Sequence, residues 1–279
     1  MVTQNIISWK HDNKIEFLYD HLINTLIQAR ILLKNEIMTY VNKSSLILLR
    51  DINSEKIDSY REVIKNCIDL SILLHDIGKA INIYQSRENL SRLKPRFTHH
   101  EILSSLFLYK TYRKMRIGIK EIYLIPLIAV LNHHHGMRSY IEKMVGENID
   151  INTISYQIID DLKKISKEPY IYFKIDNNYI ISLLQKVQLD NKIIIDACTK
   201  SIDELRSKRN LSIIQGFLKE IKMYISPTGD RYRGVNTAPL IPIATGIIVI
   251  ADYISAKNRG GTSFYSELLY KELSYRLTK

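Results

Sequence analysis

The residues best suited to chemistry stand at the end of an apolar run, in the stretch Leu73-Leu74-His75-Asp76-Ile77-Gly78-Lys79. His75 and Asp76 offer one nitrogen and one oxygen donor side by side, a mixture that suits borderline divalent metals such as Mn, Fe, Co, Ni or Zn. Lys79 shares their face of a helix, so its ammonium group could point at an anion that the metal holds. A His-Asp pair taken alone is more often a surface or helix-end pair. The metal interpretation therefore depends on the rest of the chain.

Histidines recur at two further places. Thr98-His99-His100-Glu101 fits a capping box, which puts both histidines in the first turn of a helix. The apolar segment 117–131 is expected to be a central helix, and it is followed by Asn132-His133-His134-His135 and by Gly136, a natural C-terminal cap. A histidine tract of this kind is typical of metal binding.

Two more candidates are single residues in predicted helices. Asp252 is the only carboxylate in an apolar helix expected over 239–259, and its charge is costly there unless a metal, Lys257 or Arg259 neutralises it. His21 borders the apolar face of a helix expected from Lys14 to about Val41. In isolation, a core-edge histidine hydrogen-bonded to backbone is the better interpretation of His21.

Composition bounds the class of protein. The 279 residues are 46% hydrophobic and 25% charged, which is ordinary for a folded protein and excludes wholesale disorder. The net charge of +11 favours polyanionic partners, nucleic acid first and an anionic membrane second. Cys67 and Cys198 are too few for a disulfide framework or a thiolate zinc site, so any metal must be held by histidine and carboxylate.

Several cations are candidates for contact with a nucleic acid. Arg231 and Arg233 follow a strong turn signal, and Lys257 and Arg259 follow Asp252, so these four are the better candidates. Lys110, Arg113, Lys114, Arg116 and Lys120, interleaved with Tyr109 and Tyr112, form either a basic track for a single strand or a solvated helix face.

The chain carries no apolar signal-peptide core near Met1, and its longest apolar run, 238–251, is too short to span a bilayer. We therefore expect a cytoplasmic protein with no membrane partner. A Gly-rich phosphate loop with Lys-Ser/Thr is absent from the sequence, so ATP hydrolysis is not indicated.

Taken in order, these features resemble the HD superfamily of metal-dependent phosphohydrolases, and within it the CRISPR-associated HD nuclease of type I interference systems. The resemblance runs from His21 to about Gly261 and is carried by five motif groups: His21, His75-Asp76 with Lys79, His100-Glu101 with Ser104, His134-His135-Gly136, and Asp252 with Ser255 and Arg259.

The resemblance implies seven metal ligands, namely His21, His75, Asp76, His100, His134, His135 and Asp252. It implies that Asp76 bridges two ions and that Lys79 contacts phosphate, which makes Asp76 and Lys79 the expected catalytic residues. His100 is chosen over His99 because the family pattern places Glu directly after the ligand. His134 and His135 are chosen because Gly follows them, which leaves His133 as a spare or supporting group. Ser255 joins Lys79 and the four cations above as an expected substrate-binding residue.

The fold expected is all-α: a single HD nuclease domain over residues 1–279, with a helical insertion at about 146–236. The activity implied is hydrolysis of phosphodiester bonds in single-stranded nucleic acid, with DNA favoured and RNA as the alternative, by water activated by two divalent ions (Mg, Mn, Co or Ni). The resemblance also implies two partners, a helicase on a separate chain and an RNA-guided surveillance complex.

Two other functions are weighed beside the nuclease. A phosphohydrolase of small nucleotides would turn over free nucleotides without cutting a polymer. A non-catalytic subunit would bind single strands tightly, use metal only to brace its fold, and show no metal-dependent cleavage. The nuclease is preferred because a purely structural role does not need seven donors.

Overall fold

The computed structural model describes residues 5–11, 14–50, 52–134, 150–166, 168, 170–210, 212–225 and 239–256. Helices dominate these ranges, so the predicted all-α fold class is confirmed. The helices are α1 (Leu18–Leu32), α2 (Lys34–Leu48), α3 (Ser54–Leu74), the 3-10 helix η1 (Ile77–Ala80), α4 (Arg87–Leu90), α5 (His100–Met115), α6 (Glu121–Leu131), α7 (Ile151–Ile165), α8 (Asn177–Lys186), α9 (Lys192–Arg206), α10 (Ser212–Ile225) and α11 (Leu240–Ala256). Strand β1 (Ile7–His11) pairs antiparallel with β2 (Lys14–Phe17), and β3 (Tyr170–Ile171) pairs antiparallel with β4 (Arg209–Asn210).

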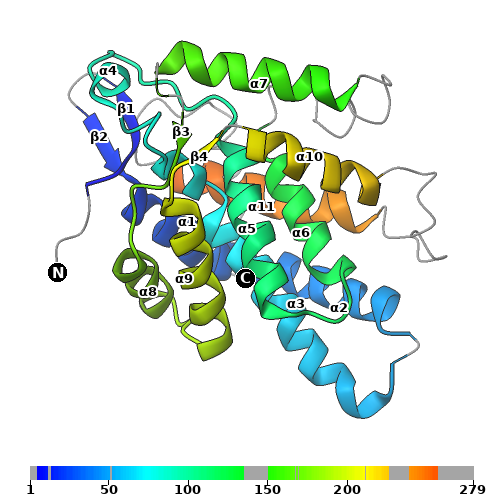
Figure 1. Ribbon diagram of the computed structural model, residues 1–279. Helices are drawn as coiled ribbons and strands as arrows, with labels where there is room; N and C mark the ends of the chain where they lie inside the picture. The colour runs from blue at the N-terminus through cyan, green and yellow to red at the C-terminus, as the bar shows by residue number, and fades with distance from the viewer. Residues whose placement is uncertain are drawn as a thin grey trace.

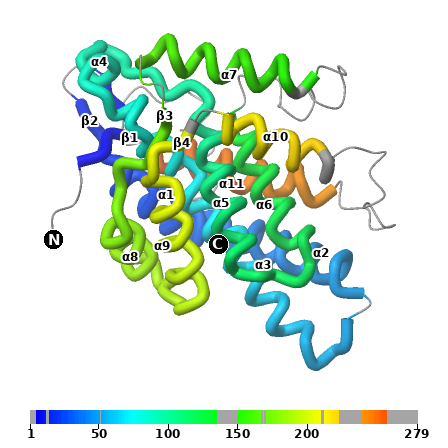
Figure 2. The backbone as a smooth tube through the Cα atoms, viewed as in Figure 1, coloured from blue at the N-terminus to red at the C-terminus, as the bar shows by residue number. Residues whose placement is uncertain are grey.

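The centre of the molecule is built from α5, α6 and α11 (Figures 1 and 2). Helix α6 is apolar on every side, and its residues from Ile122 to Leu131 are all buried. A helix that is hydrophobic all round can only be stable inside the core. It packs against α3, α5 and α11, while α1 packs against α3 and α11. These contacts bring together helices that lie far apart in the sequence.

Helix α3 changes character along its length. Its first half is largely exposed, whereas the residues from Cys67 to Leu74 are all buried. Asn53 caps its N-terminus by accepting a hydrogen bond from the backbone N–H of Glu55, and the helix ends at Leu74 with His75 as its C-terminal cap. The apolar second half therefore carries His75 and Asp76 into the interior.

The single helix predicted from Lys14 to about Val41 is wrong in two respects. Residues 14–17 form strand β2, because backbone pairing with β1 replaces the helical hydrogen bonds. The helix is then interrupted at Leu33, whose φ of −115° and ψ of 22° lie outside the helical region. Buried residues continue at intervals of three and four residues through this point, so the interruption leaves no trace in the apolar periodicity.

Helices α7 to α10 lie within the predicted insertion. Helix α9 packs against α5, and its buried Ile194, Cys198 and Ile202 belong to the same hydrophobic cluster as the central helices. Helix α7 packs against α10 on the outside of the molecule (Figure 1). Within the described ranges this part of the chain shares the main core, and the boundaries at about 146 and 236 remain predictions.

None of the helices in the described ranges combines the length and the apolar character that crossing a bilayer requires.

Candidate metal centre

His75 and Asp76 lie at the junction of α3 and η1, where both side chains are buried. His75 continues the helical backbone of α3, whereas Asp76 has φ −107° and ψ 3° and ends it. The buried apolar run that precedes them fixes their position, because moving either residue to the surface would pull Leu73 and Leu74 out of the core.

The start of α5 places His100 opposite Asp76. The capping box predicted at Thr98 is wrong: the N-cap is His99, which makes no side-chain capping bond and has a left-handed backbone with φ 68°. This left-handed residue turns the chain sharply, so that His100 begins the helix with its ring directed inward. His99 instead contacts α7, with 3.0 Å between its Nε2 and Oδ2 of Asp161.

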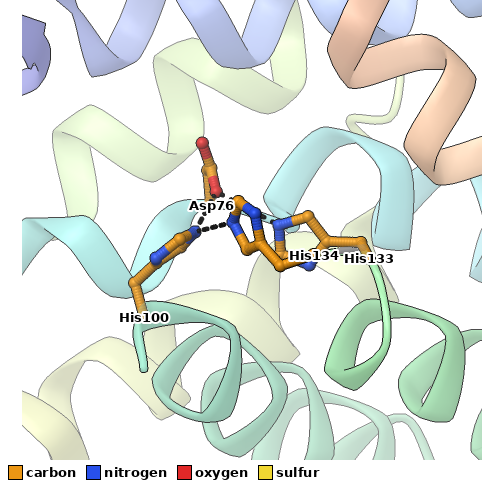
Figure 3. A group of neighbouring side chains, drawn as sticks. All are labelled: Asp76, His100, His133 and His134. Carbon is orange, nitrogen blue, oxygen red and sulfur yellow. Dashed lines mark hydrogen bonds and ion pairs between the residues drawn. The ribbon is translucent and has the colours of Figure 1, made fainter. Parts of the chain in front are cut away.

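The histidine tract follows α6 without belonging to it. The helix ends at Leu131, as expected, but its C-cap is Asn132, so the expectation that Gly136 caps it is wrong. His133 is buried and lies with His134 beside Asp76, as Figure 3 shows. His135 and Gly136 lie outside the described residues.

His21 on α1 and Asp252 on α11 complete the centre from the other side. His21 Nε2 lies 3.1 Å from Asp76 Oδ2 and 3.3 Å from Asp252 Oδ1. His75 Nε2 lies 3.6 Å and 3.5 Å from the same two oxygens. Packing of α11 against α1 brings Asp252 to this position.

Two groups of donors result, and they share Asp76. The first comprises Asp76, His100, His133 and His134, and the second comprises His21, His75, Asp76 and Asp252. In each group the ligand atoms lie within 4.8 Å of one another. The two carboxylate oxygens of Asp76 face different groups: Oδ1 lies 2.7 Å from His100 Nε2, and Oδ2 lies nearest to His21 and His75.

Backbone carbonyls fix the tautomers of three of the histidines. Nδ1 of His75 lies 2.9 Å from the carbonyl oxygen of Ile72, and Nδ1 of His133 lies 2.6 Å from that of Val130. His100 has the same relationship to Phe97. A carbonyl oxygen only accepts, so each Nδ1 carries the proton and each Nε2 presents a lone pair to the centre. Metal-ligating histidines in proteins are commonly oriented in this way.

The inward atoms have no hydrogen-bond partner, which tests whether a metal would fit. His75 Nε2, His133 Nε2, Asp76 Oδ1 and Asp252 Oδ1 are all buried acceptors without a donor. Buried polar groups are normally paired, because an unpaired one costs the free energy of its desolvation. Since lone pairs on nitrogen and oxygen face one another here, the residues fit a divalent cation of the kind that imidazole and carboxylate ligands bind.

The charges around Asp76 keep it ionised. Burial by itself raises the pKa of its carboxyl group, but Lys79, His75 and His100 outweigh burial and hold that pKa well below its usual value. The pKa of the Asp252 carboxyl group is also held well below its usual value, because the neighbouring imidazoles of His21 and His75 outweigh its burial. Burial and the neighbouring His133 and His100 lower the pKa of His134 to about 2, so this imidazole stays neutral.

Lys79 is held beside the centre. Its Nζ lies 2.5 Å from Asp76 Oδ2 and 5.6 Å from the centre of the Phe97 ring. Its side chain is almost completely buried, which places a fixed positive charge next to the shared carboxylate.

Ser255 lies next to His21. Its hydroxyl oxygen is 3.3 Å from His21 Nδ1, accepts a hydrogen bond from Thr25 and donates to the carbonyl oxygen of Asp252. Of the other expected substrate-binding residues, Arg231, Arg233, Lys257 and Arg259 lie outside the described residues.

The basic track on α5 is largely neutralised by neighbouring helices. Lys110 and Lys114 both pair with Glu204 of α9, and Arg113 lies 3.9 Å from Glu220 of α10. Tyr112 is buried and donates to the carbonyl oxygen of Cys67. The solvated-face interpretation fits Arg113, Arg116 and Lys120, which are exposed, whereas Lys110 and Lys114 pack against the predicted insertion.

Two residues of the metal centre were not predicted from the sequence as metal ligands or as partners of a ligand. His133 was set aside as a spare group, although its burial at the end of an apolar helix was a usable signal. Glu16 of β2 lies with its Oε2 3.5 Å from His21 Nδ1, and no pattern marked it because the hairpin that carries it was not predicted.

The helical fold and its buried groups of histidine and aspartate define a protein with a candidate divalent-metal centre of the HD type. The family model described as "Cas3, HD domain" matches residues 8–259, and the chain belongs to this family.

Two relatives carry the name CRISPR-associated endonuclease Cas3-HD. The protein of Saccharolobus solfataricus is 32% identical over 95 residues, which are 31% of this chain and 40% of that protein. The protein of Methanocaldococcus jannaschii is 27% identical over 121 residues, which are 43% of this chain and 46% of that protein. The chain thus spans less than half the length of each of these relatives. No solved structure matches the chain.

Proposed function

We propose that this protein is a metal-dependent nuclease that hydrolyses phosphodiester bonds of single-stranded nucleic acid, with DNA favoured. The observation that carries the proposal is the pair of buried donor groups that share Asp76. Membership of the Cas3 HD-domain family and the name endonuclease borne by its two relatives support the reaction class.

The donor residues form two groups, and each group would hold one ion. Asp76, His100, His133 and His134 would hold one, and His21, His75, Asp76 and Asp252 would hold the other. Divalent ions, when bound, polarise phosphoryl oxygens and make water a stronger nucleophile at neutral pH. The ionised Asp76 belongs to both sets, so we expect its loss to be more damaging than the loss of any one histidine.

The protein itself supplies orientation and charge. The carbonyl groups of Ile72, Phe97 and Val130 hold three imidazole rings with Nε2 inward. Such preorganised donors need no rearrangement as charge develops on the phosphate. Lys79 adds a buried ammonium group beside Asp76, where it would offset negative charge on the non-bridging phosphate oxygens. His134 and Asp252 are only partly buried, so they mark the side from which a substrate reaches the centre.

The class of substrate follows from charge and from the names of the relatives. The net charge of +11 favours a nucleic acid, and no groove-reading motif is seen in the sequence, which favours single strands. We assign the protein to CRISPR type I interference, with a helicase on a separate chain and an RNA-guided surveillance complex as partners. This assignment rests on the resemblance to the type I HD nucleases, and the family and the names of the two relatives support the CRISPR context alone.

The test is cleavage by metal-stripped protein of labelled single-stranded DNA, single-stranded RNA and duplex DNA, with Mg, Mn, Co or Ni added in turn. Asp76→Ala and His134→Ala are compared with Asp160→Ala, which removes an exposed carboxylate that pairs with Lys164 of its own helix. Metal-dependent cutting of single strands by wild type and Asp160→Ala, but not by Asp76→Ala, would support the proposal.

Three results would point elsewhere. Full cleavage by Asp76→Ala would overturn the assignment of the centre. Turnover of free nucleotides without polymer cleavage would favour the small-nucleotide phosphohydrolase. Tight binding of single strands without cleavage under any metal would favour the binding subunit.

A further inference from the structure

A pocket of about 460 Å³ lies at the end of the helical bundle that faces away from the metal centre. Its walls come from the first half of α3, the C-terminal end of α5 and the N-terminal end of α9. The length of α3 between Tyr60 in the pocket and His75 at the metal centre is roughly 22 Å, at a rise of 1.5 Å per residue. The volume falls in the usual range for small-molecule sites, about 300–1,000 Å³.

Two cations at this pocket lack carboxylate partners. Lys56 and Arg116 are exposed and form no ion pair among the described residues. By contrast, Lys110 and Lys114 on α5 are both neutralised by Glu204. None of the lining residues is acidic, and the N-terminal end of α9 adds the positive end of a helix dipole. The pocket is therefore electrostatically suited to an anion.

Arg116 occupies an unusual backbone position. It is the C-cap of α5 and has a left-handed conformation with φ 55°. Glycine or asparagine normally fills such a position, because a larger side chain costs roughly 1–2 kcal/mol there. Backbone strain is often found at ligand sites, so the left-handed conformation of Arg116 supports the presence of a ligand site at the pocket that it lines.

The remaining walls suit a flat, partly apolar group. Tyr60 presents an aromatic ring, and Val63, Ile117 and Ile194 present apolar side chains. The Asn66 side chain makes no hydrogen bond within the described part of the chain, so its amide is free to donate and to accept. An aromatic ring, apolar contacts and an amide recognise a nucleobase, while paired cations recognise a phosphate.

We propose that this pocket binds a nucleotide, with the phosphate at Lys56 and Arg116 and the base between Tyr60 and the apolar wall near Asn66. The nucleotide is either free in solution or one unit of a single strand, and the chemistry of recognition is the same. The site stands apart from the metal donors, so the inference goes beyond the proposed nuclease and does not depend on it.

The test is calorimetric titration of the full chain in EDTA with AMP, inorganic phosphate and an eight-nucleotide single-stranded DNA. The double variant Lys56→Gln/Arg116→Gln is compared with Lys43→Gln/Arg61→Gln, which removes the same two charges from exposed positions outside the pocket. The variant Asn66→Leu removes the amide while keeping the volume of the side chain.

We expect the pocket double variant to weaken AMP binding by about tenfold or more, and the control pair to change it less than about twofold. The same loss confined to the oligonucleotide would also support the proposal and would identify a unit of a strand as the ligand. Equal effects of both double variants would show that only general charge attraction is at work and would overturn it. Phosphate that binds as tightly as AMP, with Asn66→Leu unchanged, would overturn the assignment to a nucleotide.

Discussion

The backbone N–H of Gly78 donates a hydrogen bond to the Ser104 hydroxyl at 2.8 Å, and this contact presses η1 against the first turn of α5. A Cβ added at Gly78 would lie 2.7 Å from the backbone nitrogen of Ser104 and would overlap the carbonyl oxygen of His100. Only glycine therefore allows Asp76 and His100, which flank this crossing, to approach as closely as they do.

Replacing Gly78 by alanine should move Asp76 away from His100 in the first donor group. Overpacking of a core typically costs about 1–3 kcal/mol, and we expect the free energy of unfolding in urea to fall by this amount. Gly216→Ala is the matched control, because nothing lies within 4 Å of its added Cβ. This helical substitution should stabilise the protein by about 0.5–1 kcal/mol. Equal stability of the Gly78→Ala and wild-type proteins would show that the close crossing is not required.

The position of His133 leads to a second prediction. Because its Nε2 is a buried acceptor 3.5 Å from Asp76 Oδ1, His133→Ala should weaken metal binding at the first group. We expect a loss of affinity of at least about tenfold, measured by titration of the metal-free protein with Mn or Co. His11→Ala, on strand β1, serves as the control for removal of a histidine. If the metal affinity of His133→Ala is unchanged, His133 is not a metal ligand and is only a spare group.

Ser255 supports His21, so its loss should act through the orientation of that ring. Ser255→Ala removes the hydroxyl that lies between Thr25 and His21 Nδ1, and we expect metal affinity at the second group to fall roughly 10- to 100-fold. Ser201→Ala is the control, because Ser201 is also buried but donates its hydrogen bond to the carbonyl oxygen of Ala197 within α9. If Ser255→Ala instead changes substrate binding and leaves metal affinity intact, Ser255 is a substrate contact, as the family resemblance implied.

The ion pairs of Glu204 give a prediction about pH. Burial alone raises the pKa of Glu204, but Lys110 and Lys114 outweigh it and lower that pKa to about 2 from 4.5. A carboxyl group whose pKa is lower in the folded state stabilises the protein above the unfolded value, and this contribution is lost as the pH falls toward the folded value.

Glu204→Gln should therefore lower the free energy of unfolding at pH 7 by up to about 1 kcal/mol, because the pairs are partly exposed. The difference from wild type should shrink between pH 4.5 and pH 2, as measured by urea unfolding at each pH. Glu62→Gln, at an exposed position without an ion pair among the described residues, should show no such trend. If the difference in unfolding free energy between Glu204→Gln and wild type stays constant over this range, the lowered pKa of Glu204 is contradicted.

Part of the centre follows directly from local sequence. His75 and Asp76 end a helix whose apolar run is visible in the sequence, and Asp252 is an isolated charge in an apolar helix, so both were recognisable. The convergence of His21 with Asp252 was implied only by the family resemblance. No local pattern expresses it, because it depends on how α1 packs against α11.

Other features depend on backbone geometry that residue types do not express. His99 adopts a left-handed conformation that moves the helix start to His100, although Thr98 offers a better capping side chain. Likewise, α6 ends at Leu131, ahead of Gly136, and this brings His133 into the centre. At the start of α5, tertiary contacts around Asp76 outweigh a capping preference worth about 1 kcal/mol.

The most direct test of the account is the metal content of wild type, Asp76→Asn and His134→Ala after loading with Mn and removal of free ion. We predict two bound ions per chain in wild type, about one in His134→Ala, and none in Asp76→Asn, because Asp76 belongs to both donor groups. Two ions retained by Asp76→Asn, or a single ion in wild type that His134→Ala leaves in place, would contradict a shared carboxylate at the centre.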